Sequence, residues 1–176
     1  MAVQQLNKRI MKEIEAGYKS TEFKFFHDAD EKYGDRNACY LKFQIKSGIY
    51  VNQIHILQFK FMYGANQKYC FPKNPPNVLF MTPIYHTNIA SSGSICLDVI
   101  KDDVWSPLYG IETIFNSILA LLEDPNTKSP FNQEAMLQYL KHEKNLKEYE
   151  KICYDHYIKN IKNLGHDLLK STEFDY

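Results

Sequence analysis

One cysteine of this chain stands in a stretch without regular periodicity, among polar and small residues. Cys96 follows the amide side chain of Asn88 by eight residues, and residues 91–94, all serine or glycine, stand between them. A thiol is the strongest side-chain nucleophile at neutral pH, because roughly a few per cent of it is thiolate at a reference pKa of about 8.5. An amide can donate a hydrogen bond to the oxyanion that forms when a thiolate attacks a carbonyl carbon. The pair therefore predicts acyl transfer through a thioester.

Two other interpretations of these residues stay open. Cysteine is more often a core residue than a nucleophile, and Cys39 and Cys153 fit that role from their strand and helix patterns, Cys70 less clearly. His86 could form a cysteine-hydrolase triad with Cys96 and Asn88, which requires its imidazole within hydrogen-bond reach of the Cys96 sulfur. A lone histidine is more often a hydrogen-bonded structural residue.

Four short apolar segments precede Cys96 and have the pattern of strands. In residues 39–46 apolar and polar side chains alternate, as in a strand with one buried face. Residues 57–63 repeat the alternation, and apolar runs at 23–26 and 78–81 flank the two. Because short turns join these segments, we predict a four-stranded antiparallel meander.

Helical spacing of apolar residues appears on both sides of this sheet. Leu6, Ile10 and Ile14 follow one another at every fourth position, which predicts an N-terminal helix that ends at Gly17. Residues 111–122 predict the central core helix, which the Asp124-Pro125 pair closes. Shorter patterns at 136–140 and 146–161 predict two C-terminal helices.

Composition and charge limit the classes of function. A chain of 176 residues with 44% apolar residues fits one α+β domain, which we place at residues 1–164, with a C-terminal tail at 165–176. Lys plus Arg equals Asp plus Glu at 21 each, so no excess charge favours nucleic-acid binding. No apolar run approaches the 18 or so residues of a membrane span, and no secretory signal stands at the start. We expect a monomer in the cytoplasm, the nucleus or both.

The cysteines and histidines do not predict a metal site or disulfides. The four cysteines stand far apart, without a CxxC pair, and we expect reduced thiols. Cys153 and His156 supply at most half of a zinc ligand set, so we expect no bound metal.

Several motifs closely resemble those of ubiquitin-conjugating enzymes, in the same order and with nearly the same spacing. The resemblance covers some 150 residues and implies the family's UBC-like α+β fold, with an N-terminal helix, a four-stranded meander, a central helix and C-terminal helices. The motifs are YHTNI at 85–89, GSICLD at 93–98, WSP at 105–107 and LLEDPN at 121–126, with KRIMKE at 8–13, PPNV at 75–78 and the segment 130–157.

The resemblance implies a role for each residue of the central segment. Cys96 would accept the C-terminal carboxylate of ubiquitin as a thioester from an activating enzyme and pass it to a substrate lysine, usually with a ligase. No cofactor is expected, since ATP is used by the activating enzyme. The implied site consists of Asn88 for the oxyanion or loop order, Ser129 at the gate position, Asp98, Asn126 and Leu97 in the groove for the ubiquitin tail, and the structural residues His86 and Tyr85.

The same resemblance implies two partner surfaces. Lys8 and Lys12 match basic positions that meet the activating enzyme. Ser106, Pro107 and the loop around Phe71 match the surface that RING-type ligases contact. The aromatic residue of that loop is Phe71 if residues are inserted there, and is otherwise replaced by Lys73.

Departures from the family pattern leave alternatives open. Thr87 stands where the family has proline, and the neutral Ser129 stands where many relatives carry an acid that assists the incoming lysine. An inactive variant that only binds its partners is one alternative. Another is a conjugating enzyme for a ubiquitin-like modifier such as NEDD8 or SUMO.

Overall fold

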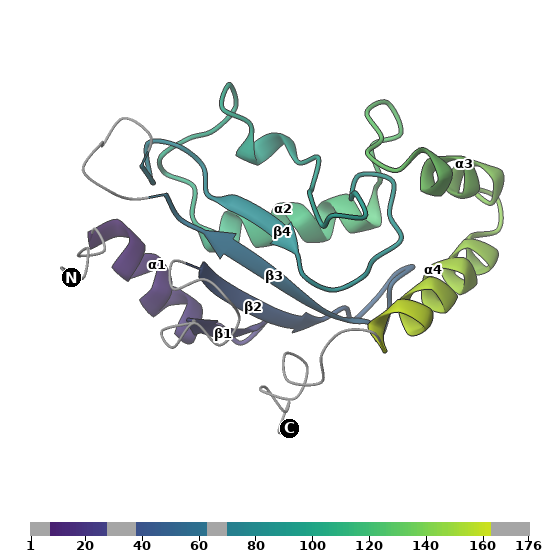
Figure 1. The fold of residues 1–176 in the computed structure, drawn as a ribbon, viewed down its shortest axis with the longest axis horizontal. Coiled ribbons are helices and arrows are strands. Elements are labelled where there is room, and N and C mark those ends of the chain that lie inside the picture. The colour runs from purple at the N-terminus through teal and green to yellow at the C-terminus, as the bar shows by residue number, and fades with distance from the viewer. Residues whose placement is uncertain (1–7, 28–37, 63–69, 163–176) are drawn as a thin grey trace.

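The computed structural model describes residues 8–27, 38–62 and 70–162. Within them four helices and a four-stranded sheet follow one another in the predicted order (Figure 1). The predicted tail at 165–176 and the helical position Leu6 lie outside the described residues. No helix in these ranges has the length and apolar character needed to cross a membrane.

The sheet is an antiparallel meander, which confirms the prediction. Its strands are β1 (Lys24–His27), β2 (Ala38–Gln44), β3 (Ile54–Lys60) and β4 (Asn77–Phe80), in the spatial order β1-β2-β3-β4. Each strand pairs with the one before it, with Leu41 opposite Leu57 and Leu57 opposite Phe80. Apolar side chains at these paired positions form one continuous apolar face.

The N-terminal helix α1 (Lys8–Tyr18) buries Ile10 and Ile14, as its spacing predicts. Gly17 lies inside this helix instead of ending it. A Cβ atom at Gly17 would lie 2.8 Å from the ring of Phe25 on β1. The glycine therefore allows the helix to pack closely on the first strand. This role depends on a tertiary contact, so the sequence around Gly17 suggested a helix end instead.

The central helix α2 (Ile111–Glu123) covers the apolar face of the sheet, behind β3 and β4 in the view of Figure 1. Phe115 of this helix contacts Phe43 of β2 edge to face, with ring centroids 5.0 Å apart, and Phe23 at 4.9 Å. Such aromatic pairs add about 0.5–1.5 kcal/mol beyond the burial of their surface. The buried residues of α2 are Ile111, Ile114, Phe115, Ile118 and Leu122.

On β2 the second face of the sheet is also buried, which corrects the prediction of a half-buried strand at 39–46. Tyr40 of β2 and Ile56 of β3 are fully buried there, and Phe26 and Met81 pack against them. Phe26 stacks on Tyr40 with centroids 5.2 Å apart. Strict alternation in sequence therefore did not distinguish a solvent-facing side of this strand from a second buried side.

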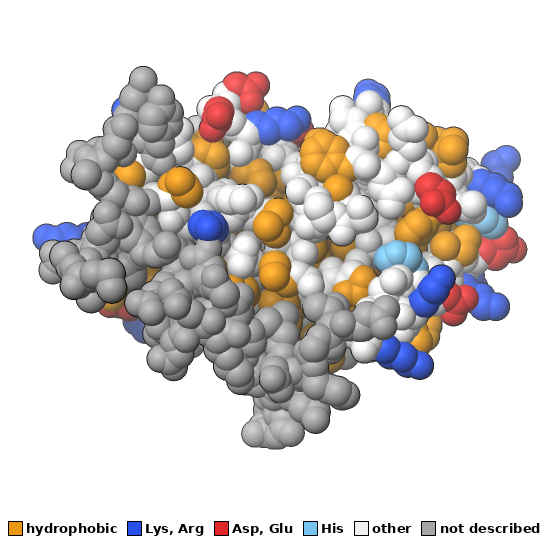
Figure 2. Space-filling model, viewed as in Figure 1, with side chains coloured by type: hydrophobic (Ala, Val, Ile, Leu, Met, Phe, Trp, Pro, Cys, Tyr) orange, Lys and Arg blue, Asp and Glu red, His pale blue; other side chains and the backbone are white. Residues whose placement is uncertain are grey.

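The C-terminal helices α3 (Gln133–Lys141) and α4 (Leu146–Ile161) stand at the end of the sheet away from α1 (Figure 1). The phenol of Tyr157 on α4 donates to the carbonyl of Ile54 at 3.1 Å and accepts from its N–H at 3.2 Å. Positive and negative side chains are interspersed over this end of the molecule (Figure 2). The two helices thus extend the core laterally and frame the segment that carries Cys96.

Candidate active site

Cys96 lies between β4 and the short 3-10 helix η2 (Asp98–Ile100), where the chain folds back along β4. The Phe80 N–H donates to the Gly93 carbonyl at 2.9 Å, and the Cys96 N–H donates to the Asn88 carbonyl at 2.8 Å. Gly93 has φ +85°, and a Cβ there would clash with the Phe80 carbonyl. A glycine is therefore required for this close return.

Burial separates the four thiols. Cys39 and Cys153 are buried, and burial raises the pKa of each to about 12, so both are core thiols at neutral pH. Cys96 and Cys70 are partly exposed. A nucleophile must be reached by its substrate, and of these four thiols only Cys96 and Cys70 are exposed enough for that.

A shallow groove runs beside Cys96. Its lining comes from residues 96–99, from Ser117, Ala120 and Leu121 of α2, and from Asp124 and Asn126, which follow that helix. Asp98 is exposed and forms an ion pair with Lys101 at 2.6 Å. The predicted groove residues Leu97, Asp98 and Asn126 thus come together here. Ser129 does not line the groove, although it is exposed and lies on the loop that follows Asn126.

The side chain of Asn88 is fully buried and holds that loop. Its Nδ2 donates to the carbonyls of Asn126 at 2.8 Å and Ser129 at 3.2 Å. Its Oδ1 accepts from the Asn126 N–H at 2.9 Å. Both amide hydrogens are therefore engaged with the backbone of residues 126–129.

His86 is also fully buried, and both of its ring nitrogens have partners other than a thiol. The Asn88 N–H donates to Nδ1 at 3.0 Å, so Nε2 carries the proton and donates to the Leu121 carbonyl at 3.0 Å. Burial lowers the pKa of His86 to about 4, which keeps the ring neutral. This arrangement opposes the hydrolase triad, because neither nitrogen is available to Cys96.

Tyr85 and Thr87 connect this segment to the C-terminal helices. The Tyr85 carbonyl accepts from the phenol of Tyr50 at 2.9 Å and from the Cys153 thiol at 3.4 Å. The Thr87 carbonyl accepts from the N–H groups of Phe131 and Asn132, each at 2.9 Å. Asn132 in turn caps α3 by accepting from Ala135.

No group of three His, Cys, Asp or Glu side chains that could hold a metal ion occurs within residues 8–27, 38–62 and 70–162.

The chemistry that this arrangement supports is acyl transfer by an accessible thiol beside a groove. The sequence model of a known family, described as ubiquitin-conjugating enzyme, matches residues 9–156. The chain belongs to the ubiquitin-conjugating enzyme family.

A curated relative is similar over part of this family member. Over 85 residues the chain is 43% identical to ubiquitin-conjugating enzyme E2 2 of Yarrowia lipolytica. The match covers 48% of this chain and 54% of that protein, so it spans about half the length of the relative.

The residues that the resemblance to ubiquitin-conjugating enzymes assigns to partner surfaces differ in their exposure to solvent. Lys8 and Lys12 are exposed on α1, Pro107 is exposed, and Ser106 is half-buried. Phe71 is only 2% exposed, which corrects its expected place on the ligase-facing surface. Its ring packs against those of Phe61 and Trp105, with centroid distances of 4.8 Å and 6.0 Å. Lys73 of the same loop is exposed.

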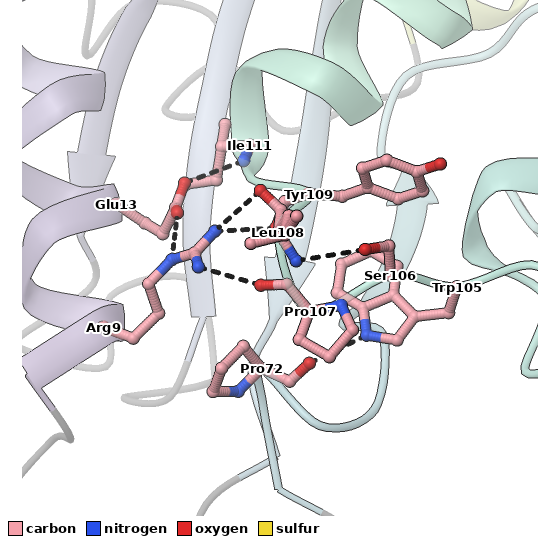
Figure 3. Close-up of polar contacts among 9 residues, drawn as sticks. All are labelled: Arg9, Glu13, Pro72, Trp105, Ser106, Pro107, Leu108, Tyr109 and Ile111. Carbon is pink, nitrogen blue, oxygen red and sulfur yellow. Dashed lines mark hydrogen bonds and ion pairs between the residues drawn. The ribbon is translucent and has the colours of Figure 1, made fainter.

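Two residues of α1 that were not singled out have central positions. Arg9 and Glu13 bond to the segment that precedes α2, almost a hundred residues away in sequence (Figure 3). Both fall within the KRIMKE motif. Their charges resembled those of a solvated helix face, so only the fold shows that they point toward another segment.

Proposed function

We propose that this chain carries ubiquitin as a thioester on Cys96 and transfers it to lysine side chains of protein substrates. The Cys96 sulfur attacks the thioester carbonyl of ubiquitin bound to an activating enzyme. A new S–C bond forms, the bond to the activating enzyme's sulfur breaks, and that sulfur takes the proton. The amine of lysine then attacks the new carbonyl, loses a proton, forms an amide and releases the Cys96 thiol.

The observation that carries this proposal is the position of Cys96, an accessible thiol at a groove in a chain of this family. Leu97, Asp98 and Asn126 provide a path along which an extended peptide tail can approach the sulfur. ATP is used by the activating enzyme, and the chain needs no cofactor of its own. Ubiquitin is the modifier that we propose, since the family is named for it.

The geometry favours loop order as the role of Asn88. Both amide hydrogens already bond to Asn126 and Ser129, so donation to an oxyanion would require one of these bonds to break. Asn88 thus fixes the backbone of the loop that carries Ser129, while the side chain of Ser129 is exposed. We assign Ser129 to the approach of the lysine amine.

Surfaces for the protein partners follow from the exposed residues. We propose that Lys8 and Lys12 contact the activating enzyme, and that Ser106, Pro107 and Lys73 contact a RING-type ligase. Asp98 and Lys101 neutralise each other beside the groove, which leaves no unpaired charge from this pair next to the ubiquitin tail.

A loading assay tests the proposal. The protein is mixed with a ubiquitin-activating enzyme, ATP and ubiquitin, and run on a gel without reductant. We expect a band heavier by one ubiquitin that thiol reductant removes, and a reductant-resistant ester with Cys96→Ser. Cys70→Ser removes the other partly exposed thiol and is the matched control, which should load as the wild type does.

The opposite results are equally informative. Loading that persists as a thioester in Cys96→Ser would assign the carrier elsewhere. No band with ubiquitin, but one with NEDD8 or SUMO and the corresponding activating enzyme, would change the modifier. No band with any of them would support the inactive variant that only binds partners.

A further inference from the structure

One arginine of α1 organises the backbone that leads into α2 (Figure 3). The Arg9 guanidinium donates from Nη1 to the Pro107 carbonyl at 2.8 Å, and from Nη2 to the carbonyls of Leu108 at 3.3 Å and Tyr109 at 2.9 Å. Its Nε donates to Glu13 at 2.6 Å. Three consecutive carbonyls thus converge on one cation, which fixes the path of residues 107–109.

Glu13 completes the arrangement at the start of α2. Its second oxygen accepts from the Ile111 N–H at 2.9 Å, at a helix start where Gly110 provides no side-chain cap. A Cβ atom on Gly110 would clash with this carboxylate, so the glycine makes room for it. A negative charge at a helix N-terminus is stabilising by about 0.3–1 kcal/mol.

The other side of the guanidinium rests on an aromatic pair. Arg9 lies over the ring of Phe71, 5.6 Å from its centroid, and Phe71 contacts Trp105. The indole N–H of Trp105 donates to the Pro72 carbonyl at 2.8 Å. The segment from Trp105 to Ile111 is therefore held at its beginning, middle and end.

Within this fixed segment, one side chain projects into solvent. Leu108 is 86% exposed, more than any other large apolar side chain that the structure describes, although its carbonyl is bound by Arg9. Its N–H donates to the Ser106 hydroxyl at 3.3 Å. An apolar side chain on a preorganised backbone can enter a pocket of a partner without the entropic cost of ordering a loop.

We propose that Arg9 and Glu13 are positioning residues for ligase docking, which hold residues 107–109 in the conformation that presents Leu108 to an apolar pocket on the ligase. This inference rests on the proposed function and identifies what its ligase-facing surface recognises. Arg9 acts through the backbone of the loop and contributes no direct contact to the ligase.

Arginine and lysine differ in this position. A guanidinium has five N–H donors in a rigid fork, and Arg9 uses them on four acceptors, whereas an ammonium has three donors at a single point. Arg9→Lys therefore keeps the charge and loses the fork. A ligase that reads the charge of Arg9 would accept this variant, while a ligase that reads the position of Leu108 would not.

The experiment measures discharge of preloaded ubiquitin to free lysine at increasing concentrations of a RING domain that stimulates the wild type. For Arg9→Lys, Gly110→Ala and Leu108→Ala we expect the RING concentration that gives half of the maximal discharge rate to rise about tenfold, because the affinity for the RING domain falls. The rate at saturating RING domain should stay the same. Glu15→Gln, an exposed change elsewhere on α1, is the matched control and should not alter that concentration.

The bonds of Arg9 to residues 107–109 and of Glu13 to Ile111 form what we call the clamp. Hydrogen exchange of the free protein tests this clamp without a ligase. Arg9→Lys should speed exchange of the amides of Leu108 and Tyr109, and leave that of the β3 amides as in the wild type. The double variant Arg9→Lys with Leu108→Ala should bind the RING domain no more weakly than Leu108→Ala alone, because both changes remove the same contact.

Several results would overturn the inference. One is an Arg9→Lys variant that binds the RING domain as tightly as the wild type, and another is unchanged hydrogen exchange at residues 108 and 109 in that variant. Additive losses of affinity in the double variant would also contradict it. So would a panel of RING domains of which none stimulates discharge from the loaded wild type. A wild type that does not load at all would instead overturn the proposed function, and the exchange measurement would still report on the clamp.

Discussion

Asn88 and Asn126 exchange two hydrogen bonds across 38 residues of sequence. Nδ2 of Asn88 donates to the Asn126 carbonyl at 2.8 Å, and Oδ1 accepts from the Asn126 N–H at 2.9 Å. A third bond, from Nδ2 to the Ser129 carbonyl, fixes the next part of the same loop. One buried amide thus joins the segment ahead of Cys96 to the loop that carries Ser129.

Asn88→Ala should destabilise the protein and slow loading and discharge to a similar extent. The change leaves the backbone groups of Asn126 and Ser129 unpaired, at a cost of about 1–3 kcal/mol. Urea unfolding and single-turnover rates of both steps provide the measurement. Asn88→Asp is the matched variant, since it keeps the acceptor for the Asn126 N–H and loses both donors. Discharge slowed far more than loading, at unchanged stability, would favour an oxyanion role.

Ser129→Asp should raise the rate of discharge to free lysine several-fold. A carboxylate at this exposed position can accept the proton of the attacking amine, whereas a hydroxyl does so poorly, and well-placed general bases contribute about 100-fold or more. The rate is measured on preloaded protein at several pH values. Ser129→Asn, similar in size and neutral, is the control. Equal rates for the two variants at every pH would remove Ser129 from the site.

Thr87→Val should leave the free energy of unfolding unchanged or raise it by about 1 kcal/mol, because it removes a buried hydroxyl that has no hydrogen-bond partner among the described residues. Thr82→Val is the contrasting variant. The Thr82 hydroxyl lies 2.9 Å from Nδ1 of His55 and accepts from the Ile56 N–H at 3.2 Å. Urea unfolding should show a clear loss for Thr82→Val alone. A comparable loss for both would show that the Thr87 hydroxyl is bonded.

Stability should fall as the pH falls below about 6.5. Burial lowers the pKa of His55 to about 3 and that of His86 to about 4, so the unfolded chain binds protons that the folded chain excludes. Each ring should then cost about 1.4 kcal/mol per pH unit from its unfolded pKa down to its folded one.

Urea unfolding between about pH 6.5 and pH 5 measures this dependence before most carboxylates titrate. His55→Gln should reduce the slope of unfolding free energy against pH by the contribution of one ring. An unchanged slope in this variant would mean that His55 is protonated to the same extent in the folded and unfolded chains.

Local patterns predicted the elements of this fold because periodicity is a property of neighbouring residues. The alternation at 39–46 and the helical spacing at 111–122 correspond to β2 and α2. Family motifs predicted the roles of Cys96 and the residues around it, which stay predictions. The burial of the second face of β2 was not predictable in this way, since it depends on neighbours such as Phe26 and Met81, which meet Tyr40 and Ile56 only in the folded sheet.

Contacts between distant segments were decided by the tertiary structure. Phe71 carries no local sign of burial, and its place beneath Arg9 follows from the packing of α1 against the loop before α2. The same holds for the partners of Asn88 and for the carbonyls that Arg9 gathers. The sequence by itself determined the order of elements and the family and predicted the nucleophile, because these reside in residue type and spacing. Only the tertiary structure decided which polar groups meet, because hydrogen bonds across 38 to 100 residues depend on how the intervening chain packs.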